Sequence, residues 1–287
     1  MAQFPGDGDG TAVQHTRAEA GVTGPAPRGR QCGTAPTKPF RTMPQQPWPY
    51  PRWIAHRGAG LLAPENTLAA FRLGAKLNYR MFECDVKLSA DGVPFLLHDT
   101  ALTRTTNGVG TASDCTWDQL ARLDAGGWHS AAFSGEPLPT LAAVAAWCQA
   151  ENRLLNIEIK PTPGNETETG RRVAQAARAL WTEAAVPPLL TSFEPACLAA
   201  AKAAAPQLPR GLLLNRQTEG WLTLAQQLGC VAVVCHHPLW TPHTVAECQA
   251  AGLRTVTYTV NDAPTAQRVL EWGLDSLITD RVDVFPA

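Results

Sequence analysis

The sequence predicts an α/β fold, a (β/α)8 TIM barrel with a small insertion after its second strand. From Trp53 onward, short runs of apolar and β-branched residues alternate with Ala- and Leu-rich stretches. Such alternation is typical of βαβ units that build a parallel sheet. Eight of these runs lie within the 241 residues that start at position 47. This length is close to the roughly 250 residues that such barrels usually have.

The predicted strands are short apolar runs, as expected for parallel strands that are buried on both faces. Each run is bounded by residues that favour helices or turns, and apolar and polar residues alternate where polar side chains occur. In chain order, the eight predicted strands are Trp53–Ala55, Met81–Leu88, Leu154–Lys160, Leu189–Phe193, Gly211–Leu214, Val231–Cys235, Thr255–Val260 and Ser276–Thr279.

The segments between these strands are predicted helices, because Ala and Leu, two strong helix formers, dominate them. A doubly wound open sheet is the competing arrangement of the same elements. It is disfavoured because no G-x-G-x-x-G follows a strand and no G-x-x-x-x-G-K-[ST] occurs in the chain. In chain order, the predicted helices are Leu68–Leu77, Leu141–Ala150, Gly170–Trp181, Ala196–Ala205, Gly220–Leu228, Pro242–Ala251 and Ala263–Trp272.

The chain divides near residue 47 into two parts of different composition. Residues 1–46 contain seven Gly and six Pro, but only four residues that are Val, Ile, Leu or Phe. A segment with so few apolar side chains cannot bury enough surface to offset the entropy that it would lose on ordering. We therefore expect residues 1–46 to form a disordered tail and residues 47–287 to form the barrel domain.

Charge and composition exclude several classes of protein. The chain carries 24 Lys and Arg against 25 Asp and Glu, a net charge of −1, so it offers no basic footprint for nucleic acid or for an anionic membrane. It contains no apolar run of the roughly 18 residues that indicate a membrane span, and its N-terminus does not resemble a signal peptide. We therefore expect a soluble, cytoplasmic protein without nucleic acid as a partner and without membrane insertion; the oligomeric state is left open.

Two of the predicted strands carry polar side chains on one face. These side chains are Glu83, Asp85 and Lys87 in one strand and Asn156, Glu158 and Lys160 in the other. Buried carboxylates are tolerated when they are paired or bound to a metal, and a set of oxygen ligands suits Mg²⁺ or Ca²⁺ better than zinc. The alternative is a structural network of ion pairs inside the barrel, with the two lysines as partners.

Two histidines stand at the ends of short apolar runs. His56 follows the first predicted strand and precedes Arg57 and Gly58, and His98 follows the run Val93–Leu97. Residues at the carboxyl ends of barrel strands are commonly catalytic, and two histidines beside carboxylates are suited to act as general acid and general base. Arg57 next to a glycine is suited to bind a phosphate through two hydrogen bonds of its guanidinium, at a point where the chain can approach closely.

Short motifs distributed in order along the chain resemble the glycerophosphodiester phosphodiesterase family, and its cytoplasmic bacterial members in particular. The resemblance covers essentially the whole chain from Trp53 to Asp280. The motifs that carry it are His56-Arg57-Gly58, Pro64-Glu65-Asn66-Thr67, Glu83-x-Asp85, His98-Asp99, Leu102-x-Arg104-Thr105-Thr106-x-Gly108, Asn156-x-Glu158-x-Lys160-Pro161, Ser192-Phe193, Thr257-Tyr258-Thr259-Val260-Asn261 and Thr279-Asp280.

The resemblance implies a TIM barrel that hydrolyses a glycerophosphodiester to glycerol 3-phosphate and an alcohol such as choline, ethanolamine or glycerol. It implies that Glu83, Asp85 and Glu158 hold a divalent cation, Mg²⁺ or Ca²⁺. It also implies that His56 and His98 are the catalytic histidines. We assign His56 as the base and His98 as the acid. The partner expected from this resemblance is a small glycerophosphodiester.

Four further residues are implied to contact the substrate or to support its binding. Arg57 matches a phosphate contact, and Lys160 matches a lysine beside the metal and the phosphate. Glu65 matches a glutamate of the site that either supports the metal ligands or binds the metal weakly. Tyr258 stands where many members of the family carry Trp, so the wall of the glycerol pocket is expected to differ.

The stretch from His98 to about Pro139 is longer than a plain βα loop, so we expect a cap over the site. Trp117, Trp128 and Phe133 are candidate walls of that site, although their packing against the barrel is the favoured role.

Two other functions are weighed. The first is a phospholipase D-like or lysophospholipase activity on the same barrel, which requires an apolar entry groove or a membrane anchor that the sequence does not show. The second is a non-catalytic binding protein, which the loss of any predicted catalytic or metal-binding residue would favour; all five are present.

Deletion of residues 1–42, which leaves Met43 as the first residue, is expected to change neither the melting temperature nor the turnover. The reason is that the deleted segment lacks the apolar side chains needed to pack on the barrel. Thermal unfolding and an activity assay of the truncated chain provide the test. A drop of several degrees in melting temperature would show that the segment packs on the barrel.

Overall fold

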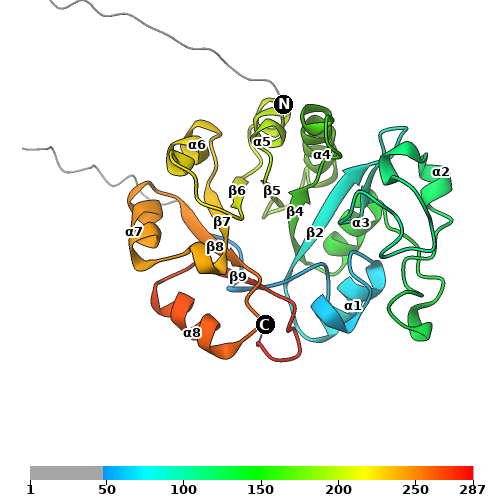
Figure 1. Cartoon of the computed structure of the whole chain (residues 1–287), viewed down its shortest axis with the longest axis horizontal. Coiled ribbons are helices and arrows are strands. Elements are labelled where there is room, and N and C mark those ends of the chain that lie inside the picture. Colours follow the sequence, from blue (N-terminus) through cyan, green and yellow to red (C-terminus); the bar gives the residue numbers. More distant parts are fainter. Residues whose placement is uncertain (1–47, 287) are drawn as a thin grey trace, which may run out of the picture. The chain divides into compact units, whose positions relative to one another are not determined.

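A computed structural model describes residues 48–286, and Figure 1 shows helices placed around a set of strands. The predicted tail, residues 1–46, and residue 47 lie outside the described residues. The strands are β1 (Trp53–Ala55), β2 (Met81–Leu88), β3 (Pro94–Leu96), β4 (Leu154–Ile159), β5 (Leu189–Ser192), β6 (Arg210–Leu214), β7 (Ala232–His236), β8 (Arg254–Tyr258) and β9 (Ser276–Thr279).

The strands form a closed barrel. They are ordered β1-β9-β8-β7-β6-β5-β4-β2-β3, and an additional pairing of β1 with β2 closes the ring. All pairings within the ring are parallel, whereas β3 pairs antiparallel with β2 and lies outside the ring. The predicted eight-stranded parallel barrel is therefore confirmed, and each predicted strand is present with ends that differ by at most two residues.

Helices connect the strands of the ring. They are α1 (Leu68–Lys76), α2 (Trp117–Leu120), α3 (Leu141–Ala150), α4 (Glu166–Leu180), α5 (Pro195–Ala204), α6 (Trp221–Gln227), α7 (Pro242–Ala250) and α8 (Ala263–Glu271). Helix α4 begins four residues before its predicted start, because Glu166 and Glu168 occupy its first turn and negative charge is favourable at a helix N-terminus. Several helices begin at a capping side chain: Thr67, for example, accepts a hydrogen bond from the amide of Ala70.

The barrel has an apolar core on both sides of its strands. Phe82, Cys84 and Val86 of β2 point outward and belong to the large core between strands and helices. Met81, the first residue of the same strand, points inward and belongs to a second cluster inside the barrel. Tyr50 packs against this inner cluster, and its hydroxyl donates to the carbonyl of Pro187 over 2.9 Å. Apolar residues thus fill the amino-terminal end of the barrel, and polar side chains occupy the carboxyl-terminal end.

The insertion after β2 has a small core of its own. Strand β3 folds back on β2, and Phe95, Leu102, Leu120 and Leu138 belong to a cluster of buried side chains within the insertion. Trp117 packs against this cluster, and its ring lies 6.1 Å from that of Phe95. The insertion is therefore a packed unit, which we call the cap (residues 94–140).

Among residues 48–286, no helix is both long enough and apolar enough to cross a lipid bilayer.

Candidate active site

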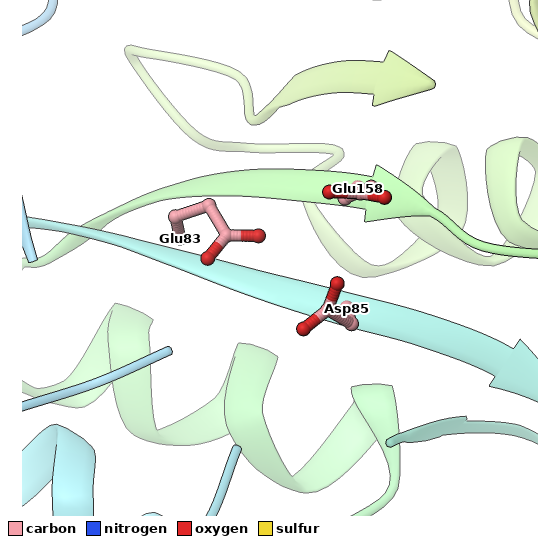
Figure 2. Close-up of side chains that lie close together, drawn as sticks. All are labelled: Glu83, Asp85 and Glu158. Atoms are coloured by element: carbon pink, nitrogen blue, oxygen red, sulfur yellow. The ribbon is translucent and has the colours of Figure 1, made fainter. Parts of the chain in front are cut away.

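Three carboxylates meet at the carboxyl-terminal half of the barrel interior. Glu83 and Asp85 lie on β2 and Glu158 on the neighbouring β4, and Figure 2 shows them turned to the same side of the sheet. The register of the parallel pair places Asp85 opposite Glu158. One oxygen atom from each carboxylate lies within 4.8 Å of the others. The three side chains, two from β2 and one from β4, thus form a group that could hold a metal ion.

The environment of Glu83 fits a bound cation. Its side chain is buried, and its Oε1 atom has no hydrogen-bond partner. Burial and the nearby charges of Asp85 and Glu158 raise the pKa of Glu83 to about 8. A buried carboxylate with an unpartnered oxygen carries an unmet electrostatic cost. A divalent cation with a preference for oxygen ligands would remove that cost.

Asp85 is held in place from several sides. The side-chain amide of Asn66 donates to its Oδ2 over 2.8 Å, and the amide of Asp85 itself donates to Oδ1 of Asn66 over 3.0 Å. The Nε of Arg57 and the Nζ of Lys160 lie 3.3 Å and 3.5 Å from its carboxylate oxygens. Burial opposes ionisation of Asp85, but Arg57 and Lys160 outweigh that effect and hold its pKa well below the ordinary value.

The two lysines of the polar faces have different partners. Lys160 donates to Oε1 of Glu158 over 2.9 Å, whereas Lys87 donates to the backbone carbonyl of Lys160 over 3.3 Å. The structural ion-pair network that the sequence allowed is therefore present for one lysine, beside the carboxylates. The network leaves Oε1 of Glu83 without a hydrogen-bond partner, so these ion pairs do not provide partners for all the oxygen atoms of the three carboxylates.

His56 follows β1 and is oriented by a residue from the opposite end of the domain sequence. Its Nδ1 lies 2.6 Å from Oδ1 of Asp280, which follows β9, and the side-chain amide of Asn261 donates to Oδ2 of Asp280 over 2.8 Å. The pairing of β1 with β9 brings these residues together. With Nδ1 held by Asp280, Nε2 faces the acidic group and lies 3.7 Å from Oε2 of Glu83.

His98 reaches the same site by a different route from the predicted one. The run that precedes it is β3, which is antiparallel to β2 and is not a strand of the barrel. Because β3 folds back along β2, the amide of Leu97 donates to the carbonyl of Asp85, and His98 arrives at the level of the carboxylates. Its Nδ1 lies 2.6 Å from Oδ1 of Asp99. Each histidine is thus paired with an aspartate through Nδ1.

The pKa values of the two histidines shift in opposite directions. Burial opposes protonation of His56, but the hydrogen bond to Asp280 and the charge of Glu83 outweigh it and raise its pKa above the ordinary value. At His98, burial, together with the charges of Arg57 and Lys160, outweighs Asp85 and lowers the pKa. The site therefore gives its two histidines different pKa values, an arrangement suited to general acid–base chemistry.

Arg57 is placed by an unusual backbone. Its φ angle is 50° and that of Gly58 is 106°, and such left-handed conformations concentrate at functional sites. A Cβ atom on Gly58 would lie 2.6 Å from the Cβ of Ala70, so helix α1 leaves room only for glycine there. The turn directs the amide of Arg57 to Oε2 of Glu83 over 3.1 Å and its guanidinium to Oε1 of Glu65 over 2.8 Å.

The side chain of Glu65 has its partners among arginines. Oε1 accepts from Arg57 and from Arg104, and Oε2 accepts from Arg104, all over 2.8 Å. Burial raises the pKa of Glu65 less than the two arginines lower it. Of the two roles expected for Glu65, this geometry favours support of the site over direct binding of a metal.

A cavity of about 170 Å³ opens beside these groups. Its lining residues are His56, Arg57, Glu83, His98, Asn156, Glu158, Lys160, Thr191, Phe193, Leu213, Tyr258, Thr259 and Ile278. Tyr258 and Phe193 form an apolar wall with their rings 5.9 Å apart, and the hydroxyl of Tyr258 donates to the carbonyl of Leu214 over 2.9 Å. The cavity thus combines an apolar wall with titratable and cationic groups, as ligand sites commonly do.

The structure brings seven of the nine predicted site residues to the lining of this cavity. The other two, Asp85 and Glu65, are not among the described residues that line it, and both contact Arg57. Trp117, Trp128 and Phe133 of the cap are not among the described residues that line the cavity. Asp99, Asp280 and Asn66 belong to the family motifs, but the sequence alone predicts no role for them. Their signal was their position directly after His98, at the end of the last strand, and next to Glu65, which does not by itself indicate a partner.

Comparison with known proteins places this site in a family. The sequence pattern of the glycerophosphoryl diester phosphodiesterase family matches residues 56–284. The chain belongs to this family. It is therefore a phosphodiesterase of the glycerophosphodiester class, as the sequence motifs predict. The match begins at His56 and spans the carboxylates, both histidines and Asp280.

Individual relatives of this phosphodiesterase cover most of the chain. It is 34% identical over 235 residues to a glycerophosphodiester phosphodiesterase of Caldanaerobacter subterraneus, covering 79% of this chain and 93% of that protein. A phosphodiesterase of Oleispira antarctica, solved in complex with the product sn-glycerol-3-phosphate, is 33% identical with a TM-score of 0.75, covering 80% and 93% of the two chains. The glycerophosphodiester phosphodiesterase of Agrobacterium tumefaciens is 27% identical with a TM-score of 0.70, covering 82% and 99%.

Proposed function

We propose that this phosphodiesterase hydrolyses glycerophosphodiesters to glycerol 3-phosphate and an alcohol such as choline, ethanolamine or glycerol, with a bound divalent cation and two proton-transferring histidines. The observation that carries the proposal is the meeting of two aspartate-paired histidines and a three-carboxylate group at one cavity. The product bound to the Oleispira relative supports the glycerol 3-phosphate half of the substrate.

Glu83, Asp85 and Glu158 would hold the cation, and their oxygen atoms suit Mg²⁺ or Ca²⁺. When bound, such a cation supplies charge that stabilises the anionic phosphodiester and its transition state. Arg57 and Lys160 line the same cavity and add fixed positive charge from the protein. Both side chains are held by carboxylates, Arg57 by Glu65 and Lys160 by Glu158, so little reorganisation is needed when a phosphate arrives.

The proton transfers are assigned to Nε2 of each histidine, because Nδ1 is engaged by an aspartate. His56 accepts a proton from the nucleophile, either the neighbouring hydroxyl of the glycerol or a water molecule. His98 donates a proton to the departing alkoxide. A cation held by Glu83 would cancel the attraction that Glu83 exerts on protonated His56, so a comparison of leaving groups, not the pKa directions, tests this order.

The glycerol end of the substrate is assigned to the wall formed by Tyr258 and Phe193. Both residues line the cavity, as do Thr191 and Leu213. Because the hydroxyl of Tyr258 donates a hydrogen bond to the carbonyl of Leu214, the ring of Tyr258 presents carbon atoms to the cavity. We infer that this ring packs against the carbon backbone of glycerol.

A panel of glycerophosphodiesters tests the proposal. Incubation with glycerophosphocholine, glycerophosphoethanolamine or glycerophosphoglycerol is expected to release glycerol 3-phosphate, which an enzyme-coupled assay measures. Lysophosphatidylcholine is included because it distinguishes a lysophospholipase of the phospholipase D type, which would release lysophosphatidic acid. Turnover of the lysolipid alone, or of no diester in the panel, would contradict the proposal.

Other expectations stay predictions. These are the cytoplasmic location, the absence of a nucleic-acid partner, and the independence of the barrel domain from residues 1–46.

A further inference from the structure

Arg104 lies in a motif that none of the roles above uses. It belongs to Leu102-x-Arg104-Thr105-Thr106-x-Gly108 in the cap, and its side chain is partly exposed at 43%. Its guanidinium contacts two carboxylates at once. Nε and Nη2 donate to the two oxygens of Asp99 over 2.6 Å and 3.0 Å, and Nη1 and Nη2 donate to the two oxygens of Glu65 over 2.8 Å each.

Each of these carboxylates holds a group of the proposed active site. Asp99 contacts Nδ1 of His98 at 2.6 Å, and Glu65 accepts from the guanidinium of Arg57 over 2.8 Å. The two carboxylates come from different parts of the chain, because Glu65 precedes α1 and Asp99 follows β3. Arg104 is therefore the link between the segment that carries Arg57 and the segment that carries His98.

The cap presents Arg104 on a firmly packed turn. Leu102, Thr105 and Thr106 on either side of it are buried. The hydroxyl of Thr106 donates to the carbonyl of Leu102 over 2.6 Å and accepts from the amide of Gly108 over 3.0 Å. A rigid turn restricts where the guanidinium can lie, so the positions of both carboxylates depend on the cap.

The contacts require the shape of arginine as well as its charge. Both carboxylates are bound with two hydrogen bonds each, and a planar guanidinium offers donors in such a fixed fork. A lysine ammonium is a single point of charge and cannot form two such pairs together. The hydrogen bond from Arg104, together with His98, outweighs burial and holds the pKa of Asp99 well below its ordinary value, so Asp99 remains an ionised acceptor for His98.

We propose that Arg104 is a positioning residue for the phosphodiesterase reaction. Through Asp99 it sets the orientation of His98, and through Glu65 it sets that of Arg57. This inference rests on the proposed function of the same site. Since Arg104 is not among the described residues that line the cavity, its effect is on the geometry of the reacting groups and not on a direct contact with substrate.

Kinetics of Arg104→Lys and Arg104→Gln test the inference. Both variants are expected to lower kcat on glycerophosphocholine by about 10- to 100-fold, the cost of displacing a catalytic group by about 1 Å, while KM changes by less than about threefold. Arg171→Lys and Arg171→Gln are the matched controls. Arg171 lies on α4, is 40% exposed, and also binds one carboxylate, Glu168, through two nitrogens; its variants are expected to keep wild-type kcat and KM.

A double-mutant cycle separates positioning from other roles. Asp99→Asn is combined with Arg104→Gln, and the loss caused by Arg104→Gln is expected to shrink when the Asp99→Asn change is already present, because residues that act through one contact are not additive. Thermal unfolding of each variant accompanies the kinetics. Wild-type kcat in Arg104→Lys, a rise in KM at constant kcat, or fully additive losses would each overturn the inference.

Failure of the inference differs from failure of the proposed function. If the wild-type chain releases no glycerol 3-phosphate, the function is wrong. If the wild-type chain is active and the Arg104 variants match the Arg171 controls, only the role of Arg104 is wrong.

Discussion

Dialysis against an excess of chelator is expected to abolish turnover of glycerophosphocholine, and addition of Mg²⁺ or Ca²⁺ is expected to restore it. Glu83, Asp85 and Glu158 lie with one oxygen each within 4.8 Å of one another. Without a cation, their repulsion is opposed by the charges of Arg57, Lys160 and Lys87 and by that of any protonated histidine. Oε1 of Glu83 has no hydrogen-bond partner. Full activity in excess chelator would exclude the proposed metal site.

Glu83→Gln provides the corresponding variant. An amide keeps the shape of the side chain but removes its charge, so the affinity for the cation is expected to fall by at least about 10- to 100-fold, the range seen even for outer partners of metal ligands. Glu151→Gln is the control, because Glu151 lies exposed at the end of α3. It is expected to bind the cation as the wild-type chain does.

Thermal unfolding gives a readout that does not depend on activity. A cation at 100 times its Kd adds about 2.7 kcal/mol to stability, which corresponds to a rise of about 5 to 10 °C in melting temperature for a domain of this size. The wild-type chain and Glu151→Gln are expected to show this rise, and Glu83→Gln is expected to lose it at the same concentration. In chelator, Glu83→Gln is expected to melt no lower than the wild-type chain, because burial raises the pKa of Glu83 and thus disfavours its ionised form.

Replacement of the two histidines is expected to produce losses that depend on the leaving group. Choline leaves as a basic alkoxide that needs a proton in the transition state, whereas nitrophenolate leaves readily as an anion. If His98 is the acid, His98→Ala should lower the rate on glycerophosphocholine by about 10² to 10⁴, the usual contribution of general acid–base catalysis. The same variant should lose far less on a glycerophospho-nitrophenyl ester.

His56→Ala is expected to lower the rates on both substrates alike, because the nucleophile must be activated whatever group leaves. His243→Ala is the control, since His243 lies on α7 with its side chain 81% exposed, and it should match the wild-type chain. A rescue by nitrophenolate in His56→Ala instead would exchange the two roles. Equal losses on both substrates in both variants would show that neither histidine is a simple leaving-group acid.

Much of the fold follows from local patterns in the sequence. The alternation of apolar runs with Ala-rich stretches predicts the barrel, because the strand of each βαβ unit is buried and the helix that follows covers it. The side-chain period of two predicts that Glu83 and Asp85 share a face of β2. Met81 lies on the same face and belongs to the cluster inside the barrel, so this is the inner face. The same rule applies to Asn156 and Glu158 on β4, which pair with Glu83 and Asp85.

The partners of the site residues could not be predicted in this way. Asp280 is 224 positions away from His56, and only the pairing of β1 with β9 brings them together. The antiparallel return of β3 places His98 beside Asp85, although the run before His98 resembles a barrel strand. The contact of Arg104 with Glu65 spans 39 positions and depends on how the cap packs.

The sequence by itself determined the barrel, the face that carries the acids, and the family to which the chain belongs, because strand period and ordered motifs are local properties. Only the tertiary structure decided which aspartate holds each histidine, that Glu65 is bound between two arginines, and that Arg104 joins the two sides of the site. These contacts arise from strand order, register and cap packing. Such features are set by the burial of the whole core, and no short segment of the sequence contains them.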